Sequence, residues 1–112
     1  MAQPDLEAAP SAGAAISEVG AAGREENRLV IEAETAAQIV NRARTIVQRR
    51  IYDLDEQGCA EDAARLRRTA KPLLHRLLRS IDHRDEAAVQ AVIETWGPLV
   101  RDEARLWDKL DG

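Results

Sequence analysis

The sequence has very few aromatic residues and only one cysteine. Among its 112 residues there is no phenylalanine, two are tryptophan and one is tyrosine. A hydrophobic core must therefore be built from leucine, isoleucine, valine and alanine, which suffices for a small bundle but stabilises it only thinly. Cys59 has no second cysteine with which to form a disulfide or a cysteine-based zinc site. We expect a reducing, cytoplasmic location.

Long apolar runs and leader signals are missing as well. No stretch approaches the roughly 18 uninterrupted apolar residues of a membrane span, so we expect none. The N-terminal residues have no basic start and no run of large apolar side chains, so we expect no signal peptide. Residues 1–24 are rich in alanine, glycine and proline, and they predict a flexible, acidic tail ahead of a domain at residues 25–112.

What the sequence does have is helical periodicity. Apolar residues recur at steps of three and four, which is the spacing of one helix face. The pattern predicts one helix over residues 25–57 and a second over residues 61–81. Gly58 stands between them, and glycine just after a helix is a common stop signal because it tolerates the left-handed conformation.

A third helix is predicted from Asp82, as its N-terminal cap, to Leu110. The pair Gly97-Pro98 interrupts it, because proline lacks an N–H and clashes with the preceding turn. No segment alternates apolar and polar residues as a strand would. Short connections make successive helices antiparallel neighbours. We therefore predict an all-α, antiparallel three-helix bundle, or four helices if the chain breaks at Gly97-Pro98.

The first helix is apolar over a wide arc, because Ile39 and Ile46 flank its main seam. A stripe wider than one neighbour can cover indicates a second neighbour. We therefore predict a homodimer or a partner helix along residues 29–54, with Ile39 and Ile46 at the contact. The alternative is that the third helix wraps round the first and covers the extra stripe.

Two charged residues fall on otherwise apolar stripes: Arg44 in the first helix and Glu103 in the third. Charges on such a seam are seldom buried without a partner. One hypothesis is that the two form an interior polar pair, or meet a partner subunit, and so fix the register of the helices. The alternative is that Arg44 extends to solvent and the kink at Pro98 turns Glu103 outward.

The most distinctive segment is basic. Residues 65–81 contain six Arg or Lys and no Asp or Glu, although the whole chain has a net charge of −4. On a helical wheel the leucines share one side, and the opposite side carries Arg65, Arg68, Arg76 and Arg79. Acidic residues of the first and third helices are one candidate counter-charge, which would need no function. An acidic protein partner is another.

The acidic-partner reading is favoured by the choice of arginine, since the chain has 14 Arg and 2 Lys and guanidinium makes bidentate contacts with carboxylates. Nucleic acid is the alternative ligand for the Arg-rich face of residues 65–84. That reading is weakened because the basic stretch has no aromatic for base stacking and the chain is acidic overall. Binding to a membrane surface is less favoured, because the leucines are better explained as core.

Trp107 is predicted either as a core anchor or as an exposed contact for a partner. His75 and His83 have no third ligand at a metal-binding spacing, so no metal site is predicted. No glycine-rich phosphate loop, nucleophile elbow or similar catalytic motif is present. An enzyme or ligand binder would need an Arg-lined anionic site, for which the candidates are Arg44, Arg50, Arg67 and Glu103.

The sequence therefore favours a small, non-catalytic interaction or regulatory protein, an adaptor that acts through helix surfaces and self-associates. Nucleic-acid binding through the Arg-rich face is the second hypothesis, and the Arg-lined anionic site is the third. No cofactor is implied by any of the three.

Overall fold

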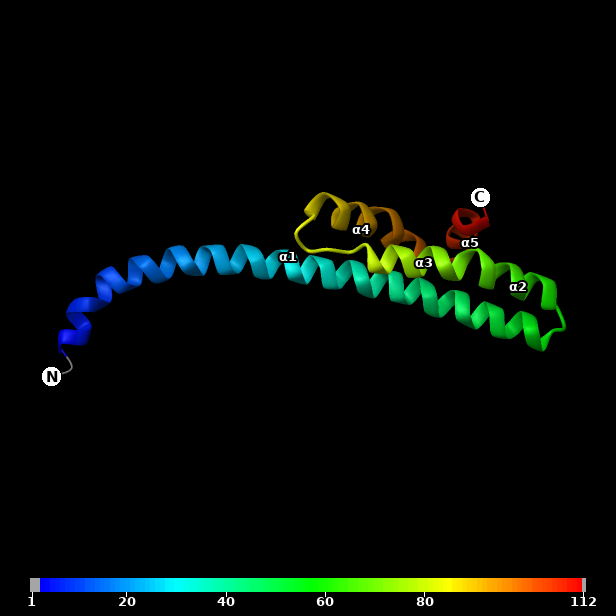
Figure 1. The fold of residues 1–112 in the computed structure, drawn as a ribbon, viewed down its shortest axis with the longest axis horizontal. Coiled ribbons are helices and arrows are strands. Elements are labelled where there is room, and N and C mark those ends of the chain that lie inside the picture. The colour runs from blue at the N-terminus through cyan, green and yellow to red at the C-terminus, as the bar shows by residue number, and fades with distance from the viewer. Residues whose placement is uncertain (1–2, 112) are drawn as a thin grey trace.

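One long helix, α1 (Gln3–Glu56), runs the length of the molecule. The computed structural model describes the backbone of residues 3–111 and the side chains of residues 22–111. Figure 1 shows the remaining helices lying alongside the C-terminal half of α1. The molecule measures 78 × 26 × 21 Å, and this length is close to the roughly 80 Å expected for a helix of that many residues at 1.5 Å per residue.

The N-terminal end of α1 differs from the sequence-based boundary. The helix was predicted to begin near Glu25, whereas in the structure it begins at Gln3. Alanine has the highest helix propensity, and this segment is rich in it. The predicted tail over residues 1–24 falls mostly on residues 1–21, whose side chains lie outside the described part, so its flexibility stays a prediction.

The second arm of the bundle is α2 (Ala60–Arg68) followed by α3 (Ala70–Arg79). The sequence predicted a single helix here, and the break at Thr69 has a local cause. Pro72 has no N–H to donate to the carbonyl of Arg68 four residues earlier, and its ring crowds that carbonyl. Thr69 nevertheless stays right-handed helical, with φ −107° and ψ −60°. The α2–α3 arm is therefore a bent helix that keeps its register.

The third arm is α4 (Glu86–Val100) followed by α5 (Glu103–Asp111). Its cap is Asp85, whose side chain accepts a hydrogen bond of 3.1 Å from the backbone N–H of Ala88, so the prediction of Asp82 as cap is wrong. The arm does break, but beyond Gly97-Pro98. Pro98 lies inside α4, and the chain turns at Arg101 and Asp102.

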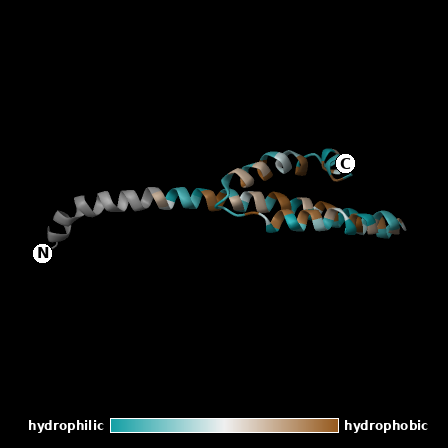
Figure 2. Ribbon diagram, turned by 45° about the horizontal axis from the view of Figure 1, so that its top comes forward, coloured by the Kyte–Doolittle hydropathy of each residue, from teal (hydrophilic) through white to brown (hydrophobic). Residues whose placement is uncertain are grey.

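The core forms where α1 meets the two other arms. Both the α2–α3 arm and α4 pack mainly against α1, and their buried residues join in one cluster; Figure 2 shows apolar residues gathered along these contacts. The side of α1 toward the α2–α3 arm contributes the fully buried Val40, Val47 and Ile51. Leu106 anchors α5, with no exposed surface. Within the described residues the fold is all-α, an antiparallel bundle whose arms run up, down and up.

Gly58 ends α1 as predicted. It has φ +80°, and the next residue, Cys59, donates to the carbonyl of Leu54 at 2.8 Å. This is a left-handed helix stop, and it turns the chain directly into α2. Gly23, by contrast, lies inside α1 with no atom within 4 Å of the position that a Cβ would occupy.

We expect Gly58→Ala to lower the free energy of unfolding by about 1–2 kcal/mol, because alanine pays the left-handed penalty that glycine avoids. Gly23→Ala is the matched control and should leave stability unchanged or raise it by up to about 1 kcal/mol, since it improves helix propensity. Urea denaturation followed by circular dichroism measures both. Equal destabilisation by the two substitutions would contradict this account of the turn.

Candidate functional site

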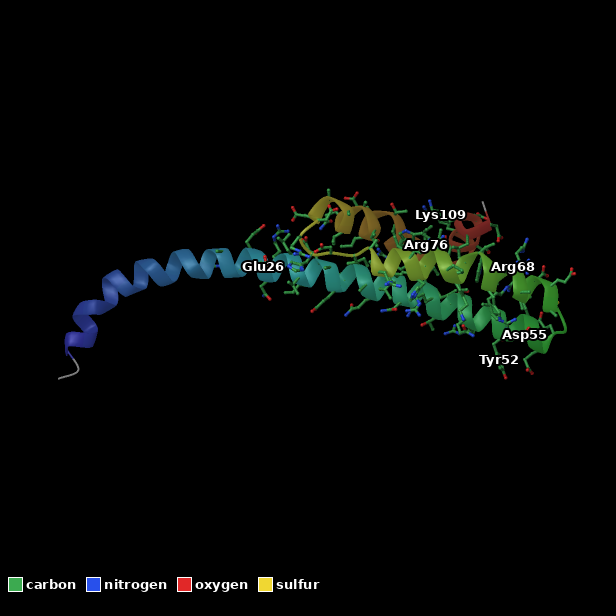
Figure 3. All side chains as sticks on the ribbon, viewed as in Figure 1. Glu26, Tyr52, Asp55, Arg68, Arg76 and Lys109 are labelled. Carbon is green, nitrogen blue, oxygen red and sulfur yellow. The ribbon has the colours of Figure 1, made fainter. Side chains whose placement is uncertain are left out.

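The predicted arginine face lies on the outside of the α2–α3 arm. Its four members are all exposed: Arg65, Arg68, Arg76 and Arg79. Because Thr69 keeps the helical register, their spacing of three, eight and three residues places them on one face. Figure 3 labels Arg68 and Arg76 on this arm. Among the described side chains, none of the four forms an ion pair.

Two of the four arginines line hollows that also contain acidic residues, Arg65 near α5 and Arg79 beside Glu34 and Asp82. Arg65 lines a small hollow of about 180 Å³ whose lining also includes Asp62 and Asp111. The same hollow is walled by Trp107.

The ion pairs among the described side chains involve other residues of the bundle. Arg28 on α1 contacts Glu25 at 2.5 Å, Glu32 at 2.7 Å and Glu86 at 2.6 Å. Its contact with Glu86 ties α1 to the start of α4. The Arg28 hydrogen bond holds the pKa of Glu25 below its ordinary value of 4.5.

The turn between α3 and α4 has one further ion pair and one hydrogen bond to α1. Arg84 pairs with Asp82, and its side-chain and backbone hydrogen bonds lower the pKa of Asp82. His83 lies 2.8 Å from Glu26 of α1. On the α2–α3 arm itself, Arg67 is paired with Asp55 of α1. The arginine ion pairs of the described side chains therefore involve Arg28, Arg67 and Arg84, and none involves the arginine face.

Arg28→Ala should lower the free energy of unfolding at pH 7 by a small amount, because the pairs are exposed and screened. A carboxylate whose folded pKa is depressed contributes stability above its ordinary pKa and loses it as the pH falls through the folded value. The difference between wild type and variant should therefore shrink below about pH 4.5. Denaturation curves at pH 7 and pH 3 test this. The control is Arg24→Ala, also exposed, which should show no such pH dependence.

The predicted interior pair of Arg44 and Glu103 is not formed. Both residues are exposed, and no charged side chain is buried in the part of the chain described. Arg44 donates to Asn41 at 3.0 Å on its own helix. Glu103 begins α5, because the arm breaks at Arg101 and Asp102, and it lines a different hollow. The alternative that the two turn outward is the correct one within this chain.

The proposed self-association residues are also placed differently. Ile46 is only 6% exposed and belongs to the core, and Ile39 packs against that core, 3.7 Å from the Cβ position of Gly97 in α4. Ile46 is therefore not available as an interface residue. The extra stripe on α1 is covered by α4, which was the alternative that the sequence left open. Contact of residues 29–54 with a second chain stays a prediction without this support.

Ile46→Ala should destabilise the monomeric fold by about 2–5 kcal/mol, the range for truncating a buried isoleucine. Ile31→Ala is the matched control, because Ile31 is 52% exposed on the same helix, and it should change stability little. Urea denaturation at two protein concentrations measures both. A loss that depends on protein concentration would instead return Ile46 to an interface.

The two tryptophans differ in how deeply they are buried. Trp96 is 6% exposed, whereas Trp107 is half-buried against the core. The guanidinium of Arg50 lies 5.7 Å from the centre of the Trp107 ring, a cation–π contact. Trp107 is thus mainly a packing residue, and its role in partner binding stays a prediction.

The residues proposed for an Arg-lined anionic site do not converge. Arg44 and Glu103 line different hollows, Arg50 lies on Trp107 and Arg67 pairs with Asp55. Among the described residues, no three His, Cys, Asp or Glu side chains gather as metal ligands would. None of the helices in the described part combines the length and apolar composition that a bilayer crossing requires.

A groove between α1 and α3 is the feature that sequence reasoning missed. It encloses about 760 Å³, and its lining residues come from both helices: Asn41, Arg44, Thr45, Val47, Gln48, Lys71, Pro72, Leu74 and His75. The pairing of α1 with α3 creates it, and that pairing is not readable from one helix alone. The spacing of Lys71 and His75, one helical turn apart beside the arginine face, was the available signal.

No protein-family model, curated protein or solved structure is detectably similar to this chain.

Proposed function

We propose that the chain is a small, non-catalytic interaction protein that binds an acidic protein partner through the arginine face of the α2–α3 arm. The observation that carries the proposal is the exposure of Arg65, Arg68, Arg76 and Arg79 without an ion pair in the described part of the chain. Arg28, Arg67 and Arg84 pair with carboxylates, and other exposed arginines such as Arg42 and Arg49 do not, so the face is distinguished by four such arginines on one side of one arm.

The chemistry of arginine supports a carboxylate-bearing partner. Its planar guanidinium donates two parallel hydrogen bonds to a carboxylate, and it is more weakly hydrated than an ammonium group. Complementary charge of this kind speeds encounter and selects the partner. The apolar side of the same arm is used by the core, through Leu66 and Leu74. The outward side is therefore free to act as a recognition surface without disturbing the fold.

The proposal includes a regulatory or adaptor role in a reducing, cytoplasmic compartment, in keeping with the single Cys59. Self-association is a separate proposal. Its candidate contact residues are the exposed apolar side chains of α1, such as Ile31 and Tyr52.

Nucleic acid is the second candidate, because the same exposed arginines suit phosphate oxygens. The two ligands differ in salt dependence. A duplex neutralised by several arginines loses affinity steeply and linearly in the logarithm of salt concentration, since counterions are released. A protein partner with an apolar contact loses affinity less steeply.

Replacing all four residues of the arginine face with alanine tests the proposal. Affinity for the acidic partner should fall roughly 30-fold, as expected for four exposed charge contacts of about 0.5 kcal/mol each. The partner is captured from native lysate with and without nuclease, purified, and then titrated against wild type and variant.

The matched control removes the same charge from four exposed arginines elsewhere: Arg24, Arg42, Arg49 and Arg105. It should bind like wild type, and both variants should keep the helical circular dichroism signal. Equal loss in the two variants would assign the effect to net charge and reject the face as the site. Capture of nucleic acid that is lost on nuclease treatment would support nucleic-acid binding instead.

A further inference from the structure

We propose that the hollow between α1 and the end of α4 binds a small hydroxylated phosphomonoester, of the sugar phosphate class. This α1–α4 hollow encloses about 520 Å³, within the range of roughly 300–1,000 Å³ that binding pockets occupy. None of the four arginines of the arginine face lines it, so the inference goes beyond the proposed function and does not rest on it. Its polar lining includes Gln38, Arg42, Thr45, Arg49, Arg101 and Glu103.

Three arginines from two arms converge on this hollow, unlike the set that the sequence proposed. Arg42 and Arg49 are seven residues apart, so they lie on the same side of α1, about 10 Å from each other along its axis. Arg101 lines the hollow from the end of α4. Among the described side chains, none of the three forms an ion pair. Their guanidinium groups are therefore available to one shared anion.

Arg101 is positioned by the way in which α4 ends. Its backbone N–H donates to the carbonyl of Pro98 at 3.3 Å, an i to i+3 contact of the kind that tightens the last turn of a helix. Its side-chain Nε–H donates to the carbonyl of Gly97 at 3.2 Å. This bond uses one of the five guanidinium N–H groups and leaves both Nη groups for a ligand. Because the side chain is already held, less of its freedom is lost on binding.

The number of arginines favours a phosphomonoester over a carboxylate. A phosphomonoester presents three terminal oxygens and a charge of roughly −1.5 to −2 at pH 7, whereas a carboxylate has two oxygens and a single charge. Guanidinium groups bind phosphate oxygens through pairs of parallel hydrogen bonds. The apolar lining residues Ile46 and Val100 are only 6% and 8% exposed, so the contacts with a ligand come from the polar walls.

Two acceptors in the hollow indicate that the ligand also carries hydroxyl groups. The hydroxyl of Thr45 donates to the carbonyl of Asn41 at 3.0 Å, so its oxygen is left as an acceptor. The carboxylate of Glu103 also only accepts hydrogen bonds. Inorganic phosphate would be repelled by Glu103 and would satisfy these acceptors poorly, whereas the hydroxyl groups of a sugar phosphate supply donors to both.

A nucleic acid is a less suitable occupant of this hollow. Its backbone carries further phosphates on both sides of any phosphate that is bound. The turn beside the hollow has two exposed acidic residues, Asp102 and Glu103, and like charges placed against each other are destabilising. A small molecule with a single phosphate avoids most of this repulsion.

Isothermal titration calorimetry of the full chain in phosphate-free buffer tests the ligand class. Ribose 5-phosphate should bind at one saturable site per chain, inorganic phosphate at least tenfold more weakly, and ribose without measurable heat. No saturable binding of ribose 5-phosphate at millimolar concentration would overturn the proposal. Equal affinity for inorganic phosphate would assign the site to free phosphate, and displacement of ribose 5-phosphate by a short DNA duplex would assign it to nucleic acid.

The two fourfold alanine variants form a charge-matched pair for this site as well. The variant at Arg24, Arg42, Arg49 and Arg105 removes two of the three guanidinium groups, so it should bind ribose 5-phosphate at least tenfold more weakly, because hydrogen bonds between charged groups are the strong ones. The variant of the arginine face loses as many charges but keeps the hollow, and it should bind like wild type. Equal loss in the two variants would reject the hollow as the site.

Gln38→Trp should fill the hollow without changing charge and weaken binding of ribose 5-phosphate at least tenfold. Gln48→Trp is the matched control, because Gln48 is exposed on the same helix and lines the α1–α3 groove instead; it should bind like wild type. Both are single changes at exposed positions, so they test the hollow even where circular dichroism shows the fourfold variant to be unfolded. Wild-type binding by Gln38→Trp would place the ligand elsewhere.

Glu103→Ala tests the hydroxyl contact. Removing this negative charge should raise the affinity for inorganic phosphate and narrow the preference for ribose 5-phosphate, because one acceptor for its hydroxyl groups is lost. Asp108→Ala is the control, since Asp108 is exposed on the same helix and does not line the hollow. An unchanged preference in Glu103→Ala would contradict the assignment of a hydroxylated ligand.

The outcomes keep this proposal separate from the acidic partner. If the variant at Arg42 and Arg49 loses ribose 5-phosphate and keeps the captured partner, while the arginine-face variant does the reverse, both proposals stand. If both variants bind ribose 5-phosphate like wild type, the α1–α4 hollow is rejected and the proposed function is unaffected. If the arginine-face variant keeps the partner, the proposed function falls and the hollow stands on its own titration.

Discussion

The structure depends on α1 as a packing surface shared by two arms. The α2–α3 arm uses the side of α1 that carries Val40, Val47 and Ile51, and α4 uses the neighbouring side with Ile39 and Ile46. The core lacks phenylalanine, so these β-branched residues and the leucines opposite them supply most of the buried area. Since apolar burial is worth roughly 25 cal/mol per Å², the loss of a large side chain on α1 weakens mainly the arm that packs on its side of the helix.

The all-α class and the stop at Gly58 were readable from the sequence, because a period of three and four and a lone glycine are local signals. The breaks were harder to place. The proline at position 72 is visible in the sequence, yet the unbroken leucine pattern concealed its effect at Thr69. Pro98 has the stronger sequence signal, next to Gly97, but the helix tolerates it in its last turn and ends at Val100.

The candidate site also has one feature that the sequence predicted and several that it did not. The outward direction of the arginine face follows from one helix alone, so the sequence predicted it. The burial of Ile46 depends on where α4 packs, and the separation of Arg44 from Glu103 depends on where the third arm turns. The groove depends on the pairing of α1 with α3. No pattern within a single segment encodes these relations, and a wide apolar stripe cannot distinguish an intramolecular neighbour from a partner.

The separation of the two arms has a consequence for the order of assembly. The Arg67–Asp55 pair, which links α2 to α1, closes a chain segment of 12 residues, whereas the Arg28–Glu86 pair, which links α4 to α1, closes one of 58 residues. Loop closure scales with the logarithm of length, so the longer closure costs about 1.4 kcal/mol more in chain entropy. Because α4 packs mainly on α1, the helical hairpin around Gly58 is the contact that closes at the lower entropic cost. The α1–α3 groove and the arginine face both belong to that hairpin, the part of the fold with the lower closure cost.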